Sequence, residues 1–566
     1  MKKFLLFIFT ISMVTSCDIL DITPKDRITE DVVWEDENLI RAYHTNLYNS
    51  LLHGFRQNMQ SKATDEVYCT NAGGMNIIPY GTITPDNVTT VSSTDWAGGG
   101  NLYIWDTAFQ NIRKINIFLE QMNLTAISFD DKDRLIAEAK FLRAYVYFML
   151  LARFGEAPII EQSYEMGTDV KFTSNSFDEC VAFIEKDISE AMPALPVAYN
   201  TTDANFGRAT QSACQALLSR LYLYAASPLY NLDNDIKKWE KASIAAKTFI
   251  DTYVPNTYDL HPDYETCFNQ PSGTANKEII FARNFTASNG HQAPMDNLNR
   301  RYGGYGGWWA GNGPSQNLVD DYDMKSTGLP PFIWVNGEQQ INPESNYDPQ
   351  NPYNDRDPRF YATVIYDGGT YHGDVFEMWV SSDQKTWGID NYRQNGDNPM
   401  TNYVLRKFMP DENTPLSWQM TYTIPWIFFR VGEIYLNYAE AEFELGHEDV
   451  CRKYINKIRQ RVDMPDIPET VTGEELRTRL YNERRVELAF EEHRYFDVRR
   501  WMIAMDVDNR PIRGMTIIKE ADGKKTYKVE KLLDRVFKPQ MYLLPIATDE
   551  IRKNDGKLQQ TRTWRE

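Results

Sequence analysis

The segment from Arg300 to Pro314 (RRYGGYGGWWAGNGP) has the side chains and spacing of a sugar-binding loop. Pairs of glycines separate its four rings, which belong to Tyr302, Tyr305, Trp308 and Trp309. Glycine has no side chain to shield a ring, and it lets the backbone adopt φ > 0 and turn the rings outward. Flat aromatic faces pack against the C–H surfaces of pyranose rings. We expect at least two of these rings to contact a saccharide; the alternative is a turn whose rings fold back onto the protein.

A second segment, Ser92 to Trp105 (SSTDWAGGGNLYIW), offers similar chemistry. Trp96 precedes three glycines, and Asn101 follows them. An exposed indole and an amide that both donates and accepts hydrogen bonds suit the edge of a saccharide. Trp105 is expected at a helix start and in the core instead. Three further tryptophans in loop-like sequence carry less weight, because a single tryptophan more often anchors a loop: Trp379, Trp387 and Trp418.

Charged segments suggest other chemistry. From Glu483 to Arg500, acidic and basic residues recur at spacings of three and four, which predicts ion pairs along a helix rather than a catalytic carboxylate pair. Asp348 to Asp357 (DPQNPYNDRD) has oxygen ligands suited to calcium but lacks EF-hand spacing, so we interpret it as a structural turn and keep a structural calcium as the alternative. No other cofactor or metal is expected, because the 7 histidines show no metal-ligand spacing. Neither a nucleophile elbow, a zincin motif nor a P-loop occurs.

Composition narrows the choice of ligand. The 566 residues contain 60 Lys and Arg against 79 Asp and Glu, a formal net charge of −19. This excess argues against nucleic acid, because phosphate binding needs clustered basic residues. It also disfavours anionic ligands in general, although a local arginine would still admit one. Hydrophobic residues make up 42% and aromatic residues 13% of the chain, which excludes a disordered protein.

The first residues predict export and a lipid anchor. Lys2 and Lys3 precede an apolar run from Phe4 to Val14, which is too short to span a bilayer and is typical of a secretory signal. Small residues then lead into Cys17, as in a bacterial lipoprotein signal. We expect residues 1–16 to be removed and Cys17 to be acylated; the alternative is an ordinary cleaved signal. No later segment has the length and apolarity of a membrane span, so lipid is the expected anchor.

The later cysteines carry no clear chemistry. They show no CxxC spacing and are odd in number, which argues against a zinc site or a disulfide framework. A single disulfide stays open. The residues concerned are Cys69, Cys180, Cys214, Cys267 and Cys451.

Helical periodicity indicates the elements that position these segments. Apolar residues recur every three or four positions in five stretches. Gly155, Pro228 and Gly446 end the first three of them. The stretches cover residues 134–154, 209–226, 430–445, 450–462 and 474–496.

The same stretches indicate the fold class. Small residues that face aromatic rings are typical of tetratricopeptide-like hairpins, but a strict period of about 34 residues is absent. We therefore predict a mostly α fold in which irregular tetratricopeptide-like helical hairpins form a scaffold. Residues from about 269 to 425 are rich in Gly, Pro, Asn, Asp, Tyr and Trp, which predicts loops and small β elements that build the ligand face.

Several segments of the sequence resemble the SusD/RagB family of outer-membrane lipoproteins from Bacteroidetes, and the resemblance spans essentially the whole chain. Each is degenerate alone, but their order and spacing agree with the family. Besides Cys17 they are WDTAFQNIRKIN, AEAKFLRAYVYFMLLARFGEAPI, DRDPRFYATVIYD, FRVGEIYLNYAEAEFELG, INKIRQRVDMP, LYNERRVELAFEEHRYFDVRRW and YLLPIATDEIRKNDGKLQQ.

The resemblance implies four tetratricopeptide-like helix pairs that carry the loops of a ligand face. It implies an N-terminal region over residues 17–230 and a C-terminal region over residues 231–566, within one compact unit. By position, Trp96 and Asn101 look like the Trp and Asn of the N-terminal loop in the starch-binding member. Residues 302–309 look like its middle aromatic residues.

The resemblance also implies a non-catalytic protein at the cell surface. Such a protein is the partner of a SusC-like TonB-dependent transporter and holds an oligosaccharide or, in some branches, a peptide for import. Glycan capture is thus our leading hypothesis, and peptide capture is the alternative. A glycoside hydrolase is the third hypothesis, because it needs two carboxylates about 5–10 Å apart, which an acidic sequence does not exclude.

Overall fold

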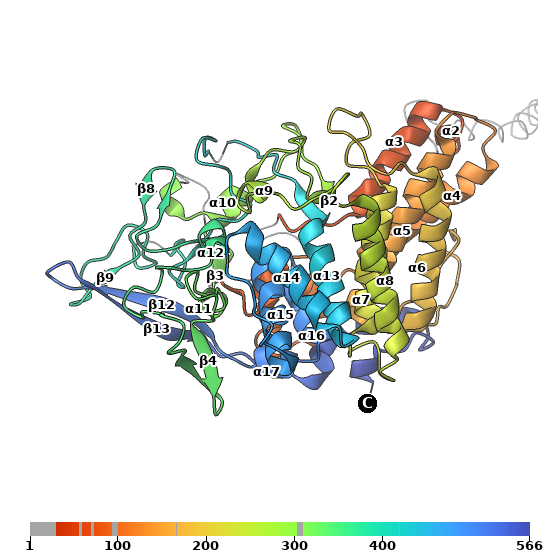
Figure 1. Cartoon of the computed structure of the whole chain (residues 1–566). Helices are drawn as coiled ribbons and strands as arrows, with labels where there is room; N and C mark the ends of the chain where they lie inside the picture. Colours follow the sequence, from red (N-terminus) through yellow and green to blue (C-terminus); the bar gives the residue numbers. More distant parts are fainter. Residues whose placement is uncertain are drawn as a thin grey trace, which may run out of the picture.

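The computed structural model describes residues 30–55, 59–69, 73–92, 100–165, 167–302, 309–394, 396–417 and 419–565. Helices from the first half of the chain gather on one side, and loops with short strands occupy the other (Figure 1). The helices α13 to α16 lie between these two parts (Figure 1). The prediction of a mostly α fold with small β elements is confirmed.

The scaffold consists of helices that pack as neighbouring pairs. Thr210 shows how one of them begins: its Oγ1 accepts a hydrogen bond from the Ala213 amide at 3.1 Å and caps α7, the first helix of the third pair. The pairs are α3 (Glu37–Leu47) with α4 (Trp105–Leu124), α5 (Lys132–Phe154) with α6 (Phe177–Ala191), α7 (Gln211–Ala226) with α8 (Ile236–Tyr253), and α13 (Val431–Glu444) with α14 (Glu448–Arg461).

The central helix α5 is buried on all sides rather than along one stripe. From Phe141 to Phe154 every residue is buried, because α4, α6 and α7 all pack against this helix. The single apolar stripe expected from spacings of three and four is therefore wrong for this part of the helix, while the expected end is confirmed. Gly155 adopts φ +73 and its amide donates to the Leu151 carbonyl at 2.9 Å, which closes the last turn.

A second difference concerns the helix expected over residues 474–496. The structure ends α15 (Gly473–Glu487) early and begins α16 (Arg494–Arg500) after a turn. Phe490 and Glu492 adopt φ +61 and +64 in this turn. The turn buries the ring of Phe490 completely and directs Glu491 towards Arg430 and Lys407, so tertiary contacts override the local helical pattern.

Small sheets shape the loop-rich side. β11 (Trp426–Arg430) pairs antiparallel with β2 (Ile279–Arg283) and leads directly into α13. β12 (Ile512–Lys519) and β13 (Lys525–Leu533) form a hairpin that β9 (Val380–Ser381) extends in parallel. β4 (Phe332–Val335) and β5 (Glu338–Ile341) are joined by Asn336 and Gly337, both at φ > 0, as a tight hairpin turn requires.

The remaining elements are short. The strands are β1 (Val67–Tyr68) with β3 (Gly313–Pro314), β6 (Val364–Ile365) with β10 (Val404–Leu405), and β7 (Thr370–Tyr371) with β8 (Asp374–Val375). The helices are α2 (Glu30–Val33), α9 (Thr266–Asn269), α10 (Ala293–Asn297), α11 (Gln316–Asp320), α12 (Pro358–Thr363), α17 (Ala504–Val507) and α18 (Thr548–Lys553).

The described residues contain no helix with the length and apolarity needed to cross a membrane. Cys17 lies outside the described residues, so its expected acylation stays a prediction. Within the described part, Cys69 and the four cysteines after it are free thiols, and the disulfide that the sequence left open does not form among them.

Candidate functional site

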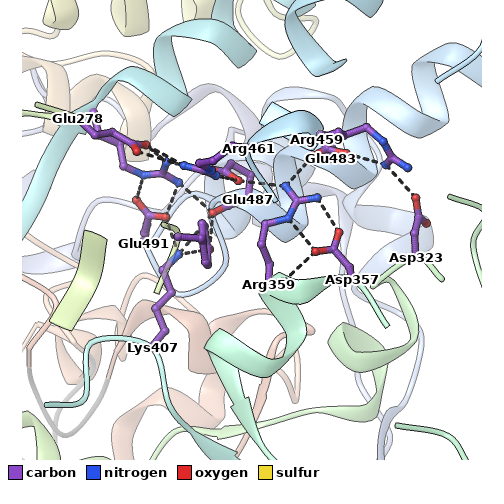
Figure 2. A network of polar contacts seen from close by, with 12 residues as sticks. Glu278, Asp323, Asp357, Arg359, Lys407, Arg459, Arg461, Glu483, Glu487 and Glu491 are labelled. Atoms are coloured by element: carbon purple, nitrogen blue, oxygen red, sulfur yellow. Dashed lines mark hydrogen bonds and ion pairs between the residues drawn. The ribbon is translucent and has the colours of Figure 1, made fainter. Parts of the chain in front are cut away.

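A buried network of charges joins the loop-rich side to the helical scaffold (Figure 2). Glu487, on α15, is its centre: the carboxylate is fully buried and contacts the guanidinium groups of Arg461 at 2.5 Å, Arg430 at 2.6 Å and Arg359 at 3.0 Å. Burial alone would raise the pKa of Glu487, but Arg461, Arg430 and Arg359 outweigh that effect and hold the pKa well below its usual value.

Loop residues enter the network at one end. Arg430, the last residue of β11, also pairs with Glu278 at 2.6 Å and with Glu491 at 2.7 Å. Lys407, which follows β10, donates to Glu491 at 2.7 Å and is itself 2% exposed. The turn between α15 and α16 and the loop after β10 are therefore fixed to one another by fully desolvated ion pairs.

At the other end the network reaches α12 and α14. Arg359 pairs with Asp357 at 2.7 Å and with Glu483 at 2.6 Å, and Arg459 joins Glu483 to Asp323 at 3.0 Å each. The ion pairs expected from the charged segment thus exist, but most connect different elements rather than successive turns of one helix. Each of these carboxylates forms an ion pair with an arginine, which supports a structural role for them.

Asp357, one of the possible ligands of the structural calcium, belongs to this charge network instead. Asp357 pairs with Arg359 and also caps α12 through the Arg359 amide at 2.9 Å. Asp348 accepts hydrogen bonds from the Gln350 amide and the Asn351 side chain. Among the described residues, no group of three or more His, Cys, Asp or Glu side chains is arranged to hold a metal ion.

Backbone hydrogen bonds join the two ends of the predicted aromatic loop and close its base. The Ala310 amide donates to the Leu298 carbonyl at 3.0 Å, and the Gly311 amide donates to the Asp296 carbonyl at 2.7 Å, so the two ends of the loop lie side by side. Trp309 is 38% exposed. Tyr305 and Trp308 lie outside the described residues, so their predicted contacts with a ligand stay predictions.

Tyr302 is an anchor of this base. Its hydroxyl donates to the Tyr371 carbonyl at 2.8 Å, and its ring packs edge-on against the Tyr371 ring at 5.7 Å. Burial raises the pKa of the Tyr302 hydroxyl above its usual value. A half-buried ring with a committed hydroxyl offers a ligand less surface than Trp309 does.

Arg301 ties the same base to Asp390 and Phe376. Its Nε donates to Asp390 Oδ1 at 3.0 Å, and its guanidinium lies 5.1 Å from the centre of the Phe376 ring. Asn299 donates to the same Asp390 oxygen at 2.7 Å. Ile389, next to Asp390 in the sequence, is 53% exposed.

The N-terminal loop has a closed base as well. The Leu102 amide donates to the Val91 carbonyl at 3.1 Å. Asn101 is 8% exposed and adopts φ +60, a conformation that Asn tolerates better than most residues. Its burial fits a residue that shapes the loop better than one that contacts a surface ligand. Trp96 lies outside the described residues.

Residues 59–60 connect the bases of the two predicted loops. The Met59 amide donates to Asn312 Oδ1 at 3.3 Å, three residues beyond Trp309. Gln60 lines a pocket of about 70 Å³ together with Asn101. The structure therefore brings the two segments that the sequence singled out to one region of the protein.

Two of the three weaker tryptophan candidates, Trp379 and Trp387, already contact other side chains of the protein. Lys519 Nζ lies 4.2 Å from the centre of the half-buried Trp379 ring, and Trp387 Nε1 donates to Gln394 Oε1 at 2.6 Å. Trp105 begins α4 and is 3% exposed, as expected for a core residue. Trp418 lies outside the described residues.

A cavity of about 430 Å³ was not predicted from the sequence. It lies between residues 198–210 of the helical part and residues 256–284 of the loop-rich part. Its volume is within the range of about 300–1,000 Å³ found for ligand sites. The polar lining includes Asn256, Gln270, Asn276 and Asn284, whose amides suit a polyhydroxylated ligand. The only sequence signal for this cavity is the frequency of Asn and Gln in these two separate segments.

Comparison with known proteins agrees with this architecture. A family model described as the SusD family matches residues 277–564, and one described as starch-binding associating with outer membrane matches residues 18–223.

Among solved structures, a SusD-like protein from Bacteroides fragilis is similar with a TM-score of 0.76 and 28% identity, over 95% of this chain and 99% of that one. A SusD-like carbohydrate-binding protein from the same organism is similar with a TM-score of 0.73 and 25% identity, over 92% and 99%. The starch-binding protein SusD of Bacteroides thetaiotaomicron is 26% identical, over 65% of this chain and 64% of that protein.

Proposed function

The chain belongs to the SusD family, and from this premise we propose that it captures an oligosaccharide at the cell surface and delivers it to a SusC-like TonB-dependent transporter. The observation that carries the proposal is the match of fold along nearly the whole chain to a SusD-like carbohydrate-binding protein. The name of the starch-binding relative supports the same class of ligand.

The geometry supports binding by ring stacking. Trp309 presents a partly exposed indole on a loop base that Arg301, Asn299 and Tyr302 hold in place. A rigid base limits the entropy that is lost when a ligand immobilises the ring. The ligand is bound and released unchanged, because the family relatives are named for binding and the carboxylates of the charged segment are committed to arginine.

The proposal is tested by applying the purified chain to an array of immobilised plant, algal and host glycans, with a peptide library as the second arm. We expect saturable binding to at least one class of glycan. Binding to peptides with none to glycans would overturn glycan capture and favour peptide capture instead.

The anchor and the partner can be tested on outer membranes. The expected lipoprotein signal supports acylation of Cys17, and the description of the N-terminal family model supports association with the outer membrane. We expect a tagged chain to co-purify with a TonB-dependent transporter from detergent-solubilised outer membranes. Cys17→Ser should leave the membrane fraction; its full retention there would contradict a lipid anchor.

A further inference from the structure

A separate polar cavity, of about 210 Å³, lies at the sheet formed by β9, β12 and β13. In Figure 1 this sheet is at the end of the molecule away from the N-terminal helices. The lining comes from β9 and the turn after it, from residues 391–393, and from both strands of the hairpin. The volume is below the usual range of about 300–1,000 Å³, so the cavity has room for a single ring rather than a chain of rings.

Asn402 provides an unused hydrogen-bond acceptor in this cavity. The residue lines the cavity, although only 3% of it is exposed. Its Nδ2 donates to the Met515 carbonyl at 2.7 Å, which fixes the amide. Its Oδ1 is buried and accepts no hydrogen bond from the described residues. A buried acceptor without a partner is costly, so a donor on a ligand gains by reaching it.

Arg393 forms no ion pair within the described part of the chain, although its charge, after Lys528 and Thr516, helps to lower the pKa of Glu530 on the same cavity. Its Nη1 donates to Gln384 Oε1 and its Nε to the Tyr392 hydroxyl, each at 3.3 Å, and both partners are neutral. The other cation of the lining, Lys528, differs because it pairs with Glu530 at 2.9 Å. The guanidinium of Arg393 is therefore available to a planar or tetrahedral anion, which arginine binds through two parallel hydrogen bonds.

We propose that this cavity binds one anionic sugar residue, a uronate or a sulfated pyranose. Its acid group contacts Arg393, one of its hydroxyl groups donates to Asn402 Oδ1, and its ring lies beside Tyr392. The inference rests on the proposed function for the sugar and on the local charge for the anion. Arg393 and Lys528 face a single carboxylate, Glu530, in a chain whose formal net charge is −19.

The test uses calorimetric titration of the purified full chain with pairs of oligosaccharides. One pair is a galacturonate oligosaccharide and its methyl ester, and the other is a sulfated galactan oligosaccharide and its desulfated form. At least one acidic form should bind about tenfold or more tightly than its neutral partner, because charge-assisted hydrogen bonds are about twice as strong as neutral ones. Inorganic sulfate at the same ionic strength should compete only weakly with the acidic oligosaccharide for the cavity.

Matched variants locate the effect. Arg393→Gln should abolish the preference for the acidic form and leave the neutral form unaffected. Lys385→Gln removes the same charge from the neighbouring turn, at a side chain that is 80% exposed and does not line the cavity, and should keep the preference. Asn402→Gly, which tolerates the φ of +56, should weaken both forms.

Three outcomes would overturn the inference: no preference for either acidic form, an unchanged preference in Arg393→Gln, or full displacement by inorganic sulfate, which would indicate a plain anion site. If the chain binds neutral glycans on the array but shows no acid preference, only this inference fails. If it binds no glycan at all, the proposed function fails.

Discussion

Replacing Glu487 with glutamine should lower the free energy of unfolding by about 3–5 kcal/mol, because removal of one partner leaves buried charges uncompensated. Glutamine keeps the shape of the side chain but withdraws the carboxylate from Arg359, Arg430 and Arg461. The measurement is equilibrium denaturation in urea followed by circular dichroism, and the midpoint should fall clearly.

The matched control is Asp549→Asn. Asp549 also pairs with an arginine, Arg552 at 2.8 Å, but both side chains are about three-quarters exposed, so the midpoint should stay where it is. Equal midpoints for Glu487→Gln and the unaltered chain would show that the network contributes nothing to stability.

The pH dependence gives the same network a second readout. The folded-state pKa of Glu487 is depressed, so its contribution is fully present above the unfolded value of 4.5 and is lost as the pH falls towards the folded value. The unaltered chain should therefore lose stability below pH 4.5, and Glu487→Gln should lose less over the same interval.

Replacing Trp309 with alanine should weaken binding of the glycan found on the array by about tenfold or more, because a well-packed aromatic anchor contributes about 2 kcal/mol or more. Trp309→Phe keeps a flat face and should lose less. Trp308→Ala and the double variant show whether the two neighbouring indoles share the contact. Calorimetric titration measures each affinity.

The control for this series is Trp334→Ala. Trp334 is 51% exposed, more than Trp309, but it lies on the β4–β5 hairpin, where Arg510 stacks on its ring at 4.1 Å. Its replacement should leave the affinity unchanged. Unchanged affinity in Trp308→Ala, Trp309→Ala and the double variant would reject the aromatic loop as the glycan site.

The helices could be predicted because their signals are local. Apolar spacing placed α5, α7 and α13 to within a few residues, and Gly155 ends α5 as expected. The break after Glu487 could not be predicted in this way, because it depends on Arg430 and Lys407, which lie far away in the sequence.

In the candidate site, too, the features formed by adjacent residues could be predicted and those formed by distant segments could not. The aromatic loop is recognisable because its rings and glycines are adjacent in sequence, although Trp96, Tyr305 and Trp308 lie outside the described residues. The two polar cavities could not be predicted, because each forms where distant segments meet. Asn402, for example, lines the cavity beside β12, where it contacts Met515, a residue more than a hundred positions away in the sequence.

The central claim is reversible capture of a glycan, and one calorimetric titration tests it most directly. The purified chain is titrated with an oligosaccharide cut from the glycan selected on the array, and the sugar is recovered afterwards. We predict saturable heat and an oligosaccharide of unchanged length. No saturable heat at millimolar concentration, or a shortened sugar with new reducing ends, would contradict the claim.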